Sequence, residues 1–310
     1  MPRPRVAHGL DDARPSGTLY LADARHPGTV TVVDVARGRV RRHRLSELSA
    51  GDPPHMLAVI GGRAVVYGSN HTSAFGASLR EPAKPLGEAW FFIPSATPGR
   101  VWLALLDRTS PATARALRGV REVTVDGETT LAHSARPPHW PLAAVDDGLL
   151  VQGNTLELWQ PTSGRILRKL PGVFPVATYH QIAVTCQPRC PALHVTNTRT
   201  GTDLQIPPRS EFRFVESYDG AFSPGGKLVA VPAITHDGHT RVAIVDMARR
   251  RATLLRGATL ARAYTLMAWS STGWLFFNAG HRRLAAYHPG AHRATLLPVR
   301  VEPFVDLAAN

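Results

Sequence analysis

The sequence lacks most of the features that would indicate a particular enzymatic reaction or a membrane-spanning segment. It has only two cysteines in 310 residues, and no run of about 18 apolar residues that could span a bilayer. It contains no GxSxG nucleophile motif, P-loop, HExxH motif or dinucleotide fingerprint, so the common hydrolase, nucleotide-binding and zincin chemistries lack their residues. We therefore expect no catalytic residues, no metal, no cofactor and no transmembrane segment.

Lysine is also scarce, although the chain is strongly basic. Of 36 basic residues only Lys84, Lys169 and Lys227 are lysines, and 23 acidic residues leave a formal net charge of +13. Such a surface attracts polyanions without sequence specificity. The arginine clusters at residues 39–44 and 249–251 fall where charge would protect an outer strand or a turn. We expect a monomer that binds a protein or an anionic polymer. The arginines are scattered along the sequence, so they do not favour specific nucleic-acid recognition.

What the sequence has instead is a repeating unit of strands and turns. Glycine and proline number 26 each, and they separate short β-branched runs that recur roughly every forty residues. The second strand of each unit is the clearest marker, and these markers begin at Leu19, Ala64, Val101, Leu149, Ile182, Leu228 and Leu275. They predict an all-β chain, a seven-bladed β-propeller with four-stranded antiparallel blades. We expect one propeller domain over residues 17–310, after a disordered or linker N-terminus over residues 1–16.

The two ends of the chain are expected to meet in the first blade. The first unit begins at its second strand, because no apolar run precedes Gly17, whereas the last unit is followed by a surplus apolar segment, FVDLAA, from Phe304. An open ring would leave two unpaired sheet edges. The surplus segment is therefore predicted to close the ring as the innermost strand of the first blade.

The two cysteines, Cys186 and Cys190, flank a tight connection between two strand-like runs. Strand ends across such a turn can come close enough for a disulfide, which we predict. Two free thiols, or a zinc site completed by His180 and His194, are the alternatives. Disulfides persist outside the cytoplasm, so a Cys186–Cys190 disulfide favours an extracytoplasmic protein. Two free thiols would favour a cytoplasmic one instead. Because residues 1–17 contain no apolar signal region, we expect a signal or anchor to be missing or to lie upstream.

A ligand site in a propeller is expected at the mouth of the central channel, where loops before the innermost strands converge. Polar and aromatic residues there could bind a ligand, or could simply cover strand ends. The candidates are His55, His139, Trp140, Tyr179, His180, Glu216, Tyr218 and Tyr264. A second histidine group, His236, Asp237 and His239, lies on an Asp-Gly turn signal and is interpreted as a solvated hairpin.

Several strand and turn phrases resemble a known group of repeats. They are TVTVVDVARGRV (29–40), LELWQPTSGRIL (156–167), LHVTNTRTGTDL (193–204) and FSPGGKLVAV (222–231), the last with Gly225 where Asp is usual. These phrases resemble bacterial seven-bladed β-propellers built from YVTN-like and WD-like repeats. The cysteines beside the turn resemble those of exported or membrane-anchored actinobacterial members. The resemblance implies a fold and not an activity.

Three classes of function are compatible with these features. The first is a non-catalytic binding or scaffolding module that docks a protein or an anionic envelope polymer on its loop faces. The second is a metal-dependent, lactonase-like propeller hydrolase that uses histidine and glutamate at the channel mouth. The third is a small-ligand sensor with the same mouth and no chemistry. We favour the binding module, since no catalytic motif is present.

Overall fold

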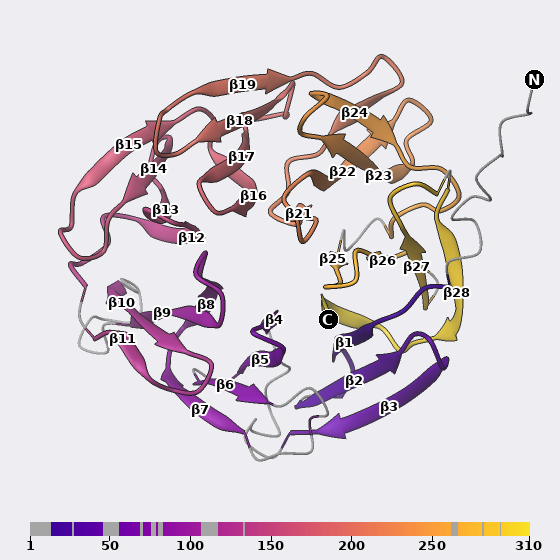
Figure 1. Ribbon diagram of the computed structural model, residues 1–310, viewed down its shortest axis with the longest axis horizontal. Coiled ribbons are helices and arrows are strands. Elements are labelled where there is room, and N and C mark those ends of the chain that lie inside the picture. The colour runs from indigo at the N-terminus through magenta and orange to yellow at the C-terminus, as the bar shows by residue number, and fades with distance from the viewer. Residues whose placement is uncertain are drawn as a thin grey trace, which may run out of the picture.

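The computed structural model describes residues 14–26, 28–45, 56–68, 71–75, 79, 83–106, 117–132, 134–261, 266–280, 282–291 and 293–310. These residues form seven antiparallel sheets, six of four strands and one of five. The sheets stand side by side in a ring, each with one strand near the centre and one on the rim (Figure 1). The fold is therefore an all-β propeller.

The first three sheets come from the N-terminal part of the chain and the C-terminal strand. Sheet 1 contains β29 (Phe304–Ala309), β1 (Thr18–Asp23), β2 (Thr29–Asp34) and β3 (Arg39–Arg44). Sheet 2 contains β4 (Met56–Ile60), β5 (Arg63–Gly68), β6 (His71–Phe75) and β7 (Lys84–Glu88). Sheet 3 contains β8 (Phe91–Pro94), β9 (Arg100–Leu106), β10 (Leu117–Thr124) and β11 (Thr129–Leu131).

The next four sheets follow in chain order. Sheet 4 contains β12 (Trp140–Val145), β13 (Gly148–Gln152), β14 (Leu156–Trp159) and β15 (Ile166–Leu170). Sheet 5 contains β16 (Phe174–Tyr179), β17 (Ile182–Cys186), β18 (Leu193–Asn197) and β19 (Asp203–Ile206). Sheet 6 contains β20 (Phe212–Phe214), β21 (Ala221–Phe222), β22 (Leu228–Thr235), β23 (Thr240–Asp246) and β24 (Arg251–Leu254). Sheet 7 contains β25 (Met267–Trp269), β26 (Leu275–Asn278), β27 (Arg283–Tyr287) and β28 (Thr295–Arg300).

The hydrophobic core lies between neighbouring sheets. One cluster joins Leu19 and Val33 of sheet 1 to Phe276 and Leu284 of sheet 7, and all four side chains are buried. Comparable clusters fill the other gaps, so each sheet is buried on both faces. This explains why the second and third strands are nearly continuous apolar runs, while the rim strand β3 is largely exposed and has arginine at four of its six positions. The expectation that residues 39–44 form a charged outer strand is confirmed.

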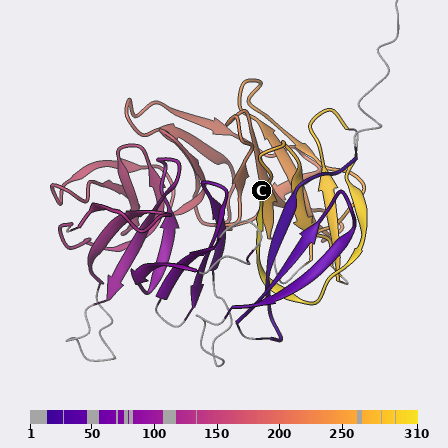
Figure 2. The same ribbon diagram turned by 60° about the horizontal axis from the view of Figure 1, so that its bottom comes forward.

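The predicted ring closure is confirmed. Strand β29 pairs antiparallel with β1, with Leu21 opposite Leu307, and the C-terminal strand completes sheet 1 from the centre. Figure 2 shows the indigo strands of sheet 1 against the yellow strands of the C-terminal end. Phe304, Leu307 and Ala308 are buried in the closing strand. Closure therefore combines backbone pairing with apolar burial.

The prediction that every blade has four strands is wrong for sheet 6. Both β20 and β21 pair with β22, and residues 215–220 leave the sheet between them. Pro232 of β22 lies opposite this gap, and it has no backbone N–H to donate to an inner strand. Only its carbonyl is used there, as the acceptor for the backbone N–H of Val215 at 3.1 Å. The interruption projects Glu216 and Tyr218 from the innermost edge.

In the described part of the chain, no helix is long and apolar enough to cross a membrane.

Candidate functional site

The innermost strands of sheets 3, 4 and 5 begin on one face of the ring, which we call the front face. The ring of Trp140, the first residue of β12, has its centroid 5.8 Å from that of Phe91, the first residue of β8. The same strands end on the opposite, back face. There the backbone N–H of Asp146, directly after β12, donates to the carbonyl of His180, directly after β16, at 3.1 Å.

The predicted site residues divide between these two faces. His139, Trp140, Glu216 and Tyr218 are on the front face. The front-face position of Tyr218 follows from its contact with Phe174, the first residue of β16, at a centroid distance of 5.7 Å. His55 and Tyr264 lie outside the described residues.

Tyr179 and His180 are on the back face, so the prediction that they precede an innermost strand is wrong. Tyr179 ends β16 opposite Ile182, and His180 lies in the tight turn between β16 and β17 with a positive φ of 49°. The Tyr179 hydroxyl donates to the carbonyl of Pro224 at 3.0 Å, and the His180 ring lies 3.2 Å from the Asp146 carboxylate. Both side chains therefore brace neighbouring turns.

The front face carries a set of aromatic side chains that we call the aromatic surface: Trp90, Phe91, Trp140, Phe174 and Tyr218. Trp90 packs edge-on against Trp140 with ring centroids 5.1 Å apart. Trp140 is 39% exposed and Tyr218 is 50% exposed, which is unusual for large rings in a folded protein. Tryptophan and tyrosine are enriched among the residues that contribute most to binding at protein interfaces.

Sequence reasoning missed three members of the aromatic surface, namely Trp90, Phe91 and Phe174. A signal was present, because an aromatic residue starts each of β8, β12 and β16, and proline follows it in Trp140–Pro141 and Phe174–Pro175. That repetition marks equivalent positions in successive sheets.

Polar contacts hold the aromatic surface in place. The Tyr218 phenol is hydrogen-bonded to the side chain of Gln152, which lies opposite Trp140 in the pairing of β12 with β13. The Glu216 carboxylate accepts a hydrogen bond from the backbone N–H of Arg189, which connects the interruption in sheet 6 to the β17–β18 turn of sheet 5. Tyr218 is thus supported from two sheets.

The cysteine pair lies beneath this part of the front face. Cys186 ends β17, and the backbone N–H of Cys190 donates to the carbonyl of Gln187 at 2.8 Å to close the turn. Both side chains are fully buried, and the structure has both as free thiols. The hydrogen bond to Cys186 raises the pKa of the Cys190 thiol, and burial raises it further. The disulfide stays a prediction.

The zinc alternative for this pair has no support in the geometry. His180 is on the back face, whereas the cysteines are at the front. The His194 ring is buried against the Asp203 carboxylate at 2.9 Å, and strand alternation turns it away from the side of β18 where Leu193 packs with Cys186. Among the described residues, no group of three or more His, Cys, Asp and Glu side chains could hold a metal ion. His236, Asp237 and His239 lie in the exposed β22–β23 hairpin, as interpreted from the sequence.

A carboxyl group of the closing strand faces the innermost strand of the next sheet. Asp306 accepts hydrogen bonds from the backbone N–H of Leu57 at 2.6 Å and from its neighbour Leu307 at 2.8 Å. Burial raises the pKa of this carboxyl to about 7, and the charge of Asp219 adds to the effect. Asp306 therefore titrates near neutral pH at the point where sheets 1 and 2 meet.

Comparison with known proteins identifies the fold and no family. No family model matches the chain, and no curated protein matches it. The structure is similar to apo AztD from Citrobacter koseri, with a TM-score of 0.56 and 12% identity over 96% of this chain and 98% of that one. It is similar to the WD40 domain of Neurospora crassa Pan2, with a TM-score of 0.55 and 10% identity over 93% and 88% of the two chains. TolB from Acinetobacter baumannii matches with a TM-score of 0.52 and 12% identity over 94% of this chain and 66% of TolB.

Proposed function

We propose that the chain is a non-catalytic binding module that docks a protein partner on its front face. With the five-stranded sheet counted as a blade, it is a seven-bladed propeller. Its strand and turn sequences favour the YVTN-like and WD-like repeats of exported or membrane-anchored actinobacterial proteins. The observation that carries the proposal is the aromatic surface, where exposed Trp140 and Tyr218 rest on a rigid backing of rings. Large rings held in place lose little conformational entropy on binding, so they suit a docking site.

The expected partner is acidic. The chain carries a formal charge of +13, and the exposed Arg189 lies in the turn whose backbone binds Glu216, two residues before Tyr218. Opposite charges would steer association and would lose effect as salt screens them. An anionic envelope polymer is the alternative partner for the front face. It would bind through the positive charge of the protein and would not need the aromatic rings.

The predicted disulfide supports an extracytoplasmic location for this module. Intact mass and thiol titration of the protein from its native host test the pairing of Cys186 with Cys190. A mass lower by two hydrogens, with no titratable thiol after unfolding, is expected. Two titratable thiols would return the module to the cytoplasm.

The docking proposal is tested by quantitative affinity capture of an acidic partner from a host extract. The double variant Trp140→Ala/Tyr218→Ala removes the exposed rings. The control Ile166→Ala/Leu167→Ala removes apolar side chains of comparable exposure from the rim strand β15. We expect the first variant to lose the partner and the rim variant to keep it. Equal capture by both variants would contradict the proposal.

The two alternatives receive less support from the front face. A metal-dependent hydrolase would need His139 and Glu216 to converge with a third ligand, yet the Glu216 carboxylate is engaged by the backbone of Arg189. A small-ligand sensor would need an enclosed site, whereas Trp140 and Tyr218 are open to solvent.

A further inference from the structure

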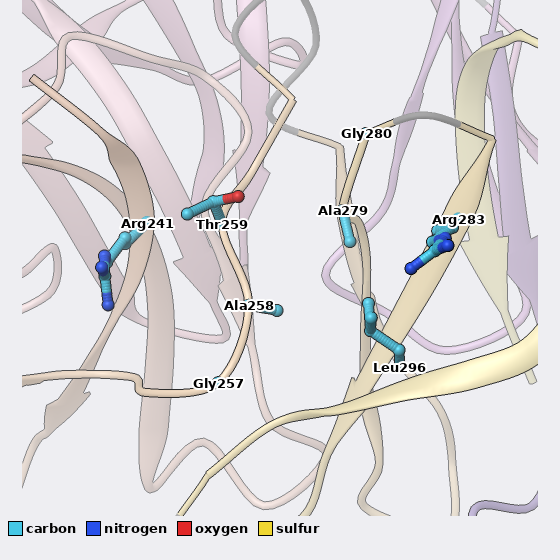
Figure 3. A pocket seen from close by; sticks show the side chains of 8 residues that line it. All are labelled: Arg241, Gly257, Ala258, Thr259, Ala279, Gly280, Arg283 and Leu296. Atoms are coloured by element: carbon cyan, nitrogen blue, oxygen red, sulfur yellow. The ribbon is translucent and has the colours of Figure 1, made fainter.

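A pocket of about 600 Å³ lies between sheets 6 and 7, away from the aromatic surface (Figure 3). Arg241, at the start of β23, stands on one side of it, and Arg283, at the start of β27, stands on the other. The segment after β24 supplies Gly257, Ala258 and Thr259, and sheet 7 supplies Ala279, Gly280 and Leu296. The volume is in the range of pockets that hold small organic molecules.

The pocket has a fixed shape because its connecting segment is hydrogen-bonded to both sheets. The backbone N–H of Leu260 donates to the carbonyl of Thr240 in sheet 6 at 2.8 Å, and that of Ala261 donates to the carbonyl of Asn278 in sheet 7 at 3.1 Å. At Gly257 φ is +98°, and a Cβ there would lie 2.4 Å from the carbonyl oxygen of Ala294. Glycine is required for this close passage.

The two arginines bring positive charge to the pocket, and the structure shows no carboxylate in ion-pair contact with either of them among the described residues. Within the part of the chain that the structure describes, the buried Nε of Arg241 also has no hydrogen-bond partner. A hydrogen bond from Thr235 lowers the pKa of Asp237, and the charge of Arg241 makes a smaller contribution in the same direction. A guanidinium group without a carboxylate in contact can still donate to an anion, so an anionic oxygen that reached either arginine would be stabilised.

The remaining lining favours an anion with an apolar body. Leu296 is 41% exposed, and Ala258 and Ala279 add methyl groups between the two arginines. Inorganic phosphate would use the charges but would leave these groups in contact with water. A branched aliphatic carboxylate would use both features, with the Thr259 hydroxyl, visible in Figure 3, as a further donor.

We propose that this pocket is a binding site for an organic carboxylate that carries an aliphatic group. Its residues are not shared with the aromatic surface, so the proposal is independent of the docking function. The carboxylate would pair with Arg283, the positive charge of Arg241 on the opposite wall would add to the attraction, and the aliphatic group would cover Leu296 and the two alanines.

The test is calorimetric titration of the full chain with 4-methylpentanoate, acetate and inorganic phosphate in about 0.15 M salt, where surface charges are screened. We expect 4-methylpentanoate to bind more tightly than acetate, by about fourfold for each CH₂ group that becomes buried. Arg283→Gln should weaken its binding by roughly tenfold, the usual effect of losing a charged hydrogen bond, and Arg241→Gln should weaken it by a smaller factor because only an attraction across the pocket is lost.

Two further variants separate this site from general attraction to a basic protein. Arg39→Gln/Arg41→Gln removes two exposed arginines from β3 and should leave binding unchanged. Leu296→Asn keeps both pocket arginines, and it should reduce the preference for 4-methylpentanoate over acetate. Absence of binding to folded wild-type protein, or equal loss in the β3 and pocket variants, would overturn the proposal, as would tighter binding of phosphate than of 4-methylpentanoate.

Discussion

Replacing Asp306 with asparagine should change how the stability of the ring depends on pH. Asp306 lies on the closing strand β29, and its carboxylate accepts the backbone N–H of Leu57 in β4 of sheet 2. Asparagine has nearly the same shape and can still offer an oxygen to Leu57. It removes the proton equilibrium of a group whose pKa is raised from 3.8 to about 7 by burial and by the charge of Asp219.

The direction of the effect follows from the raised pKa. Since the folded state holds the Asp306 proton more tightly than the unfolded chain, this group contributes stability that is complete below about pH 4. That contribution is lost as pH rises through about 7. From pH 5 to pH 8 the loss covers about two pKa units, or about 3 kcal/mol at 1.36 kcal/mol per unit. Asp306→Asn should lack this loss.

Urea unfolding of both proteins at pH 5 and pH 8 measures the difference. The free energy of unfolding of the wild type should fall by about 3 kcal/mol more than that of Asp306→Asn over this interval. Asp126→Asn, which removes an exposed carboxylate paired with Arg63, is the charge-matched control and should follow the wild type. Parallel pH profiles for the wild type and Asp306→Asn would refute the reasoning.

Two further changes test the packing of the ring. Deleting the residues after Val301 removes β29 with the buried Phe304 and Leu307, so the melting temperature should fall sharply. An unchanged melting temperature in a thermal scan would show that ring closure does not stabilise the fold. Trp159→Ala empties a fully buried position between sheets 3 and 4 and should lower the free energy of unfolding by about 3 to 5 kcal/mol in chemical denaturation. A decrease below about 1 kcal/mol would mean that the surrounding residues collapse into the space and leave no cavity.

The architecture was largely predictable from the sequence because it is encoded locally. Each unit carries its own β-branched strands and glycine turns. The first blade lacked an innermost strand, and the surplus apolar segment from Phe304 could supply it. The extra strand of sheet 6 was missed because the one residue that signals it, Pro232, is inconspicuous in the sequence. Pro232 lies within LVAVPAIT, which has the pattern of an ordinary strand. The absence of a backbone N–H at Pro232 becomes informative only when the strand that pairs with it is known.

The candidate site was less predictable, because a propeller assembles its faces from residues far apart in sequence. Whether a loop residue lies at the front or the back depends on which strand of the blade it adjoins. The sequence predicts Tyr179 and His180 at the mouth, before an inner strand, but Tyr179 ends such a strand and His180 follows it. Trp90 and Phe91 were missed because their partner Trp140 comes from the next sheet, and nothing local connects them.

Site-specific photo-crosslinking is the most direct test of docking on the front face. A photoreactive phenylalanine analogue at Tyr218 would report on the aromatic surface, and the same analogue at Leu167, 44% exposed on β15, would report on the rim. In cells of the native host, a discrete acidic protein should be linked from position 218, and this adduct should disappear when Trp140 is replaced by alanine. Adducts of equal yield from both positions, or from position 167 alone, would contradict docking on the front face.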